Sequence, residues 1–173
     1  MKYKRPYQEQ LGRIERLYGE LRKYDEATNE NFEKGIDAFT SFFIQCYHLA
    51  DWLKKSGYSE DSIYNYIKRS RYLSICHEMA NIQKHSISLT DGRQQNSKLS
   101  DFGAFEMFGV TTPISRHVDW IGDNKTKFCV HANDFAPFPI DAMELAHQCI
   151  QEWHKFLQTT PDPRASTSPS ERP

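Results

Sequence analysis

The sequence has no C-x-x-C cysteine pair, no glycine-rich phosphate-binding loop and no G-x-S-x-G turn. These absences exclude a zinc ribbon, a P-loop nucleotide hydrolase and a serine hydrolase built on a nucleophile elbow. The sequence also has no run approaching the roughly 18 apolar residues of a membrane-spanning helix. We therefore expect a cytoplasmic protein without a membrane partner, and no motif specifies a metal or a cofactor.

An excess of charge of either sign is also lacking. The formal net charge is −1, so the chain lacks the basic field with which sequence-independent nucleic-acid binders attract phosphate. Any contact with nucleic acid must therefore be local. The four cysteines, Cys46, Cys76, Cys129 and Cys149, are far apart in the sequence. We expect them to be buried as small hydrophobic residues in a reducing compartment.

Apolar residues at helical spacing dominate the rest of the chain. The longest such segment ends at Gly57, a residue typical of the position that follows a helix. Asp141 precedes the last apolar stripe and can cap the N-terminus of a helix there. The pattern predicts helices at roughly residues 7–24, 32–57, 60–85 and 142–158.

Two runs rich in β-branched and aromatic residues, VTTPISRHVDWIG and KTKFCVHAND, flank Gly122-Asp123-Asn124. This arrangement predicts an antiparallel hairpin at about residues 108–132. The predicted fold is mainly α: a four-helix bundle with a β-hairpin inserted between the third and fourth main helices. We expect one domain over residues 1–158 and, because residues 159–173 are polar and rich in proline, a disordered tail.

The stretch CHEMANIQKH in the third helix opens like a zinc-protease motif, but Asn81 stands where the second histidine belongs. On a helix, His77, Asn81 and His85 lie within roughly 80° of one another. They form a polar ladder that Ser70 and Ser74 extend towards the N-terminus. The ladder is either a network satisfied by groups of the second helix or an exposed face. The partners on the second helix would be Gln45, His48 and Asp51.

A metal site is a further alternative for these residues. His48 and Asp51 on the second helix could share an ion with His77 and His85 on the third. No ligand spacing in the sequence specifies such a site, so we expect none.

Arg71 and His77 are separated by five residues, and Asn81-x-x-x-His85 follows on the same helix. This pattern resembles the HEPN superfamily, small helical bundles that include many ribonucleases of toxin–antitoxin and phage-defence systems. The resemblance implies metal-independent RNA cleavage at a dimer cleft by Arg71, His77, Asn81 and His85. If Asn81 and His85 are the matching pair, Ala80 occupies the arginine position, and the chain is an inactive relative.

Residues around the ladder complete the predicted RNA site. Arg69 and Tyr72 form a small basic and aromatic patch, and Lys84 precedes His85, so all three are candidates for substrate binding. His48 and Asp51 would support the ladder. The implied partners are RNA, a second copy of the chain or a protein antitoxin. The rival hypothesis is a non-enzymatic interaction protein whose ladder is a structural network.

Overall fold

The structure is a computed structural model that describes residues 5–25, 31–85, 105–107, 110–112, 114–118, 126–132 and 139–163. Most of these residues are helical, which confirms the mainly α fold. The expected loop after residue 85, the hairpin turn at residues 122–124 and residues 164–173 of the expected tail lie outside the described residues. The helices are α1 (Pro6–Leu21), the short 3-10 helix η1 (Arg22–Tyr24), α2 (Phe32–Lys55), α3 (Glu60–Arg69), α4 (Arg71–His85) and α5 (Ala142–Thr159).

Helix α2 ends as its sequence predicts. Gly57 has a φ of 96°, a left-handed conformation that glycine adopts without a steric penalty. Its amide donates to the carbonyl of Lys54 at 2.9 Å, and the amide of Tyr58 donates to the carbonyl of Leu53 at 3.1 Å. These two bonds form a Schellman motif, which satisfies the last carbonyls of the helix.

The prediction of one continuous helix over residues 60–85 is wrong, because the chain breaks at Ser70. Ser70 has an extended backbone, with φ −78° and ψ 119°, and it ends α3. Its hydroxyl then accepts a hydrogen bond from the amide of Leu73 at 3.2 Å, which caps the start of α4. The third main helix of the bundle is therefore two shorter helices.

The predicted hairpin is present, since β3 (Ile114–Val118) pairs with β4 (Thr126–Val130) in antiparallel register. Two further strands were not predicted, and residues 110–112, which belong to the run expected for the hairpin, form a separate strand instead. Strand β5 (Ile140–Asp141) adds to β4, and β1 (Phe105–Met107) pairs with β2 (Val110–Thr112) in a separate sheet. β5 leads directly into α5, whose first amides donate to the Asp141 carboxylate as expected: Met143 at 2.8 Å and Glu144 at 3.0 Å.

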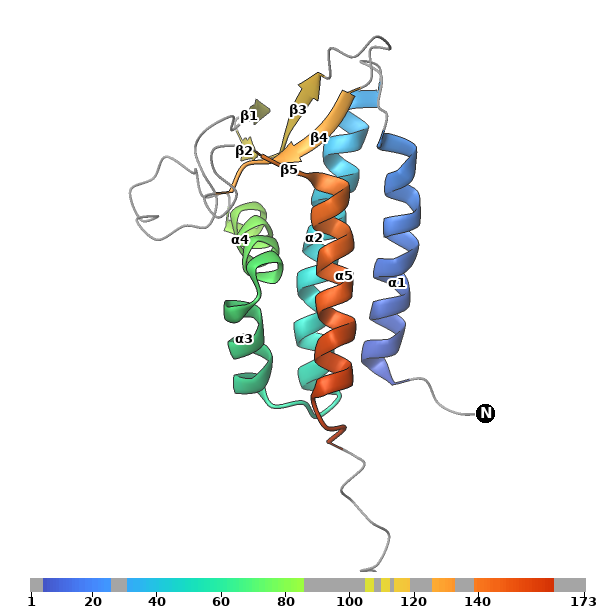
Figure 1. The fold of residues 1–173 in the computed structure, drawn as a ribbon, viewed down its shortest axis with the longest axis vertical. Coiled ribbons are helices and arrows are strands. Elements are labelled where there is room, and N and C mark those ends of the chain that lie inside the picture. The colour runs from blue at the N-terminus through green and yellow to red at the C-terminus, as the bar shows by residue number, and fades with distance from the viewer. Residues whose placement is uncertain are drawn as a thin grey trace, which may run out of the picture.

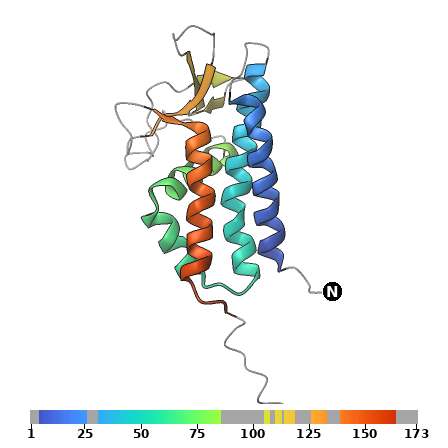
Figure 2. The ribbon, with the colours of Figure 1, turned by 45° about the vertical axis from the view of Figure 1, so that its right-hand side comes forward.

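The helices run side by side, and the strands lie together at one end of the bundle (Figures 1 and 2). Trp153, Phe39, Phe42 and Phe43 are fully buried among them. Phe128 on β4 packs against Phe39 with ring centroids 5.2 Å apart, so the sheet shares the core of the bundle. Among the described helices, none is both long and apolar enough to cross a bilayer.

Candidate functional site

A pocket of about 500 Å³ opens between α2, α3 and the end of α4. Three residues selected from the sequence, His48, Asp51 and Asn81, lie in its lining, together with Ala80 from the resemblance. The third helix therefore does direct part of its polar ladder towards the second. We call this the α2–α4 pocket; its lining residues are Ile44, Tyr47, His48, Asp51, Tyr64, Ala80 and Asn81.

His77 contacts two residues that line the α2–α4 pocket, Tyr47 and Asn81. Its imidazole stacks on the Tyr47 ring, with centroids 4.6 Å apart and planes inclined by 23°. The Asn81 side-chain nitrogen lies 2.8 Å from His77 Nε2. As the amide is assigned, its NH₂ group donates, so Nε2 must accept and the proton of a neutral ring sits on Nδ1. Asn81 Oδ1 is then the acceptor that this amide retains.

Burial lowers the pKa of His77, and Lys68 lowers it further, against an opposing effect of Glu78. The hydrogen bond and the pKa therefore agree, since both favour an uncharged imidazole near neutral pH. An uncharged ring also stacks on Tyr47 without losing the hydration of a charge. His77 thus positions Asn81 and Tyr47.

Two tyrosines provide the aromatic walls of the α2–α4 pocket. Burial raises the pKa of Tyr47, and Tyr64 and Asp51 raise it further, so its hydroxyl stays protonated. Lys54 Nζ lies 5.7 Å from the centre of the Tyr64 ring and 2.8 Å from a Glu60 carboxylate oxygen. That Tyr47 and Tyr64 line the same pocket could not be predicted, because it depends on how α2 and α3 pack against each other.

The lower half of the polar ladder is structural. Ser70 caps α4, and the Ser74 hydroxyl donates to the carbonyl of Arg71 at 3.0 Å; both serines are buried. Gln45, expected to face the ladder, instead accepts hydrogen bonds from the buried Gln10 of α1. The helical spacing shows that Gln45 is a polar residue on α2, but it does not show which neighbouring helix the side chain contacts.

The other predicted site residues are not brought together in the same way. Arg69 and Arg71 are exposed at the junction of α3 and α4, and Tyr72 is half-buried. Neither arginine lines the α2–α4 pocket. On a regular helix such as α4, positions 71 and 77 point about 120° apart. The side chains of Lys84 and His85 lie outside the part of the chain that the structure describes.

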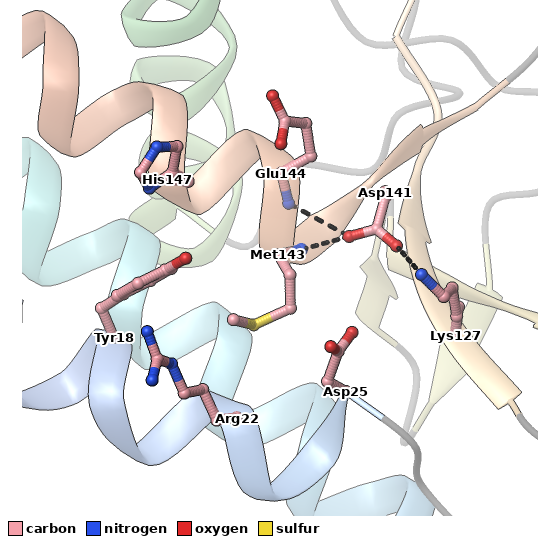
Figure 3. A pocket seen from close by; sticks show the side chains of 8 residues that line it. All are labelled: Tyr18, Arg22, Asp25, Lys127, Asp141, Met143, Glu144 and His147. Atoms are coloured by element: carbon pink, nitrogen blue, oxygen red, sulfur yellow. Dashed lines mark hydrogen bonds and ion pairs between the residues drawn. The ribbon is translucent and has the colours of Figure 1, made fainter.

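A second pocket, of about 630 Å³, lies between α1, β4 and the start of α5 (Figure 3). Its charged groups already serve the fold. The Asp141 carboxylate that caps α5 also forms an ion pair with Lys127 at 3.3 Å, and Arg22 lies 5.9 Å from the centre of the Tyr18 ring. Because these groups already have partners within the protein, this pocket is the weaker candidate for a binding site. The groups come from four segments of the chain, so no sequence pattern predicts the pocket.

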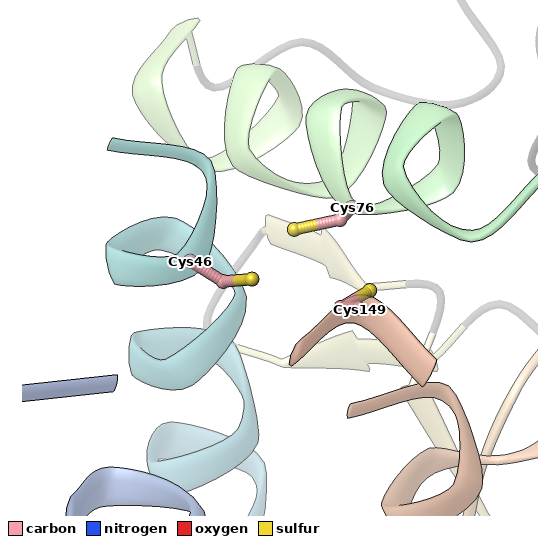
Figure 4. A group of neighbouring side chains, drawn as sticks. All are labelled: Cys46, Cys76 and Cys149. Carbon is pink, nitrogen blue, oxygen red and sulfur yellow. The ribbon is translucent and has the colours of Figure 1, made fainter. Parts of the chain in front are cut away.

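Cysteines of three helices meet in the core (Figure 4). The sulfur atoms of Cys46 on α2, Cys76 on α4 and Cys149 on α5 all lie within 4.8 Å of one another. All four cysteines are buried, as expected, but the meeting of three of them could not be predicted from their positions in the sequence. Burial raises the pKa of Cys76 and of Cys149, and hydrogen bonding with Cys46 raises both further. We call Cys46, Cys76 and Cys149 the cysteine cluster.

No protein-family model, no curated protein and no solved structure matches this chain.

Proposed function

We propose that the protein binds single-stranded RNA without cleaving it, by taking one unpaired base into the α2–α4 pocket. The hydrogen bond between Asn81 and His77 carries this proposal. It engages the NH₂ group of Asn81 and leaves Oδ1 as the acceptor of this amide, and Asn81 lines a pocket together with Tyr47 and Tyr64. Proteins recognise unpaired bases by stacking them on aromatic rings and bonding their polar edges.

The acceptors in the pocket favour a base with an amino group. Asp51 accepts hydrogen bonds through its carboxylate, and Asn81 accepts through Oδ1. Adenine and cytosine present amino donors on the edges that such acceptors contact, whereas uracil has no amino group. The proposal therefore includes a preference for adenine or cytosine over uracil.

Cations near the rim can meet the phosphates of such a strand. Lys54 lies beside the Tyr64 wall, and Lys68 is close enough to His77 to lower its pKa. The described lining residues themselves include neither lysine nor arginine. Because the lysines lie outside the lining, a nucleotide can place its base in the pocket and its phosphate near a lysine.

Several features argue for binding rather than cleavage. One ring nitrogen of His77, Nε2, is engaged by Asn81. Ala80, which cannot neutralise a phosphate, lines the pocket at the position of the arginine in one placement of the HEPN-like motif. Arg71, the arginine of the other placement, is absent from that lining. These features support the non-cleaving alternative of the HEPN-like hypothesis.

Fluorescence anisotropy with labelled oligo(A), oligo(C) and oligo(U) at low salt tests the proposal. We expect Asp51→Asn to weaken binding of oligo(A) or oligo(C) about tenfold, the effect of one hydrogen bond to a charged group. Asp37→Asn is the matched control, because Asp37 is an exposed carboxylate on the same helix. The same RNAs, incubated with protein in EDTA, should remain intact.

Equal affinity of the two aspartate variants for every RNA would remove the pocket from RNA binding. Absence of binding to all three RNAs would refute the RNA hypothesis as a whole. Cleavage that persists in EDTA and disappears in His77→Ala would instead make the protein a metal-independent ribonuclease.

A further inference from the structure

We propose that Cys46, Cys76 and Cys149 form a three-coordinate site that binds trivalent arsenic, supplied as arsenite, through three As–S bonds. This site lies in the core and is separate from the α2–α4 pocket. It does not depend on the function proposed above.

The geometry of the cysteine cluster suits a single central atom. In a triangle with sides of 4.8 Å, the largest that the cluster allows, the centre lies about 2.8 Å from each corner. Bonds from sulfur to a soft metal are about 2.3 Å long, which keeps sulfurs around one atom within about 4 Å of each other. Because a centre with a lone pair is pyramidal, its sulfurs lie closer still, so the cluster sulfurs must approach by about 1 Å or somewhat more, through rotation of the three side chains.

The number of ligands discriminates between the candidate ions. Zinc sites are four-coordinate, and no fourth cysteine, histidine or carboxylate joins the cluster among the described residues. The fourth cysteine, Cys129, is on β4 and is not part of the cluster. Trivalent arsenic forms three bonds to sulfur and carries a lone pair, so three cysteines complete its coordination.

Charge favours arsenic over monovalent copper. Each cluster residue is at most 1% exposed, and a net charge in such a place is costly unless it is paired. Copper(I) with three thiolates carries a charge of about −2. Neutral arsenous acid, As(OH)₃, reacts with three neutral thiols: three As–O bonds break, three As–S bonds form and three waters leave. No oxidant is required, and both the reactants and the bound site are uncharged.

Anaerobic refolding of the reduced full chain with arsenite, followed by native mass spectrometry, tests this site. We expect one arsenic atom per chain with the loss of three protons. X-ray absorption should show three sulfur neighbours and no oxygen at arsenic. Parallel refolding with zinc or with buffered copper(I) should give at least tenfold weaker retention.

Variants assign the site to its residues. Cys149→Ala and Cys76→Ala should each reduce arsenic retention at least tenfold, whereas Cys129→Ala, a buried cysteine outside the cluster, should retain it fully. The wild-type X-ray spectrum decides the proposal even where a cluster variant fails to fold. Oxygen neighbours at arsenic, no retained arsenic or stronger retention of zinc or copper would each overturn it, as would loss of arsenic in Cys129→Ala.

Discussion

At position 77 an imidazole lies between a tyrosine ring and an asparagine amide, and the contact with the amide requires the imidazole to be uncharged. Protonation would place an N–H on Nε2, opposite the NH₂ group of Asn81 at 2.8 Å. Two donors would then face each other until the Asn81 amide rotated. Loss of this arrangement should follow directly from protonation of His77.

The pH dependence of stability should report on His77. Burial, the largest cause, holds its pKa in the folded protein below the ordinary value of 6.5. Between the folded pKa and 6.5 the unfolded chain binds more protons, so the free energy of unfolding rises with pH. It should be highest above pH 6.5 and should decline as the pH falls below that value. Urea unfolding at a series of pH values measures this change.

His77→Gln should flatten the pH dependence between pH 7.5 and 5 relative to the wild type. His48→Gln is the control, because His48 is an exposed histidine on the facing helix and its loss should leave the slope intact. An unchanged slope in His77→Gln would show that the imidazole does not need to be neutral.

Residue patterns selected three of the residues that line the α2–α4 pocket, His48, Asp51 and Asn81. The four-residue step from His77 to Asn81 is visible in the sequence, and the two residues are hydrogen-bonded. The spacing of His48 and Asp51 likewise placed them on one face of α2, and they line the same pocket. Tyr47 could not be predicted as the partner of His77, because stacking depends on the rotation of α4 about its axis.

At the scale of elements, the attachment of the sheet to the bundle depends on the approach of β4 to the first turn of α2. A Cβ atom added to Gly35 would lie 2.6 Å from Cε2 of Phe128, well inside van der Waals contact. The ring itself is held against Phe39. Gly35 therefore lets the hairpin strand and the helix share one core.

Gly35→Ala should lower the free energy of unfolding by about 1–3 kcal/mol, because a buried aromatic ring has to move. Gly19→Ala on α1 is the matched control, since nothing lies within 4 Å of its added Cβ. That variant should gain about 0.5–1 kcal/mol, because alanine favours a helix. Chemical denaturation of both variants measures the difference, and an equal effect at the two sites would show that the sheet is not held at Gly35.

Element boundaries were predicted where a single residue type sets them. Gly57 and Asp141 act through their own backbone or carboxylate, so their roles can be inferred without knowing the fold. The break at Ser70 was missed, because apolar residues continue on both sides of it and serine also occurs within helices. Strand β5 was missed for another reason: its two residues are strand only because β4 lies beside them.

At the scale of the whole molecule, the two ends of the described chain lie next to each other. Residues 160–163, which fall within the expected tail, lie close to the start of α1. Asp162 forms an ion pair with Arg5, and a Cβ on Gly57 would lie 3.5 Å from Pro163. Composition identified this segment as polar, but it could not place Arg5 nearby.

One core joins the elements, and Trp153 lies within it. Its side chain is fully buried on α5, and its indole donates to the carbonyl of Cys46 on α2 at 3.1 Å. The edge of Phe156 meets its ring at 89° with centroids 6.1 Å apart. Trp153 also lies one turn after Cys149, so one face of α5 carries both a residue of the cysteine cluster and the largest buried side chain.

Trp153→Phe should therefore lower the free energy of unfolding by about 2–4 kcal/mol, since it removes ring volume from the core together with a buried hydrogen bond. Trp52→Phe is the matched control on α2: Trp52 is only half-buried, with Lys55 Nζ 5.3 Å from its ring centre, and its loss should cost less than about 1 kcal/mol. Far-ultraviolet circular dichroism during urea unfolding is the measurement, since it does not depend on the tryptophan removed. Among the described tryptophan contacts, the hydrogen bond of Trp153 is the one that links α5 to α2. Similar losses in the two variants would therefore contradict the role of Trp153 in joining these helices.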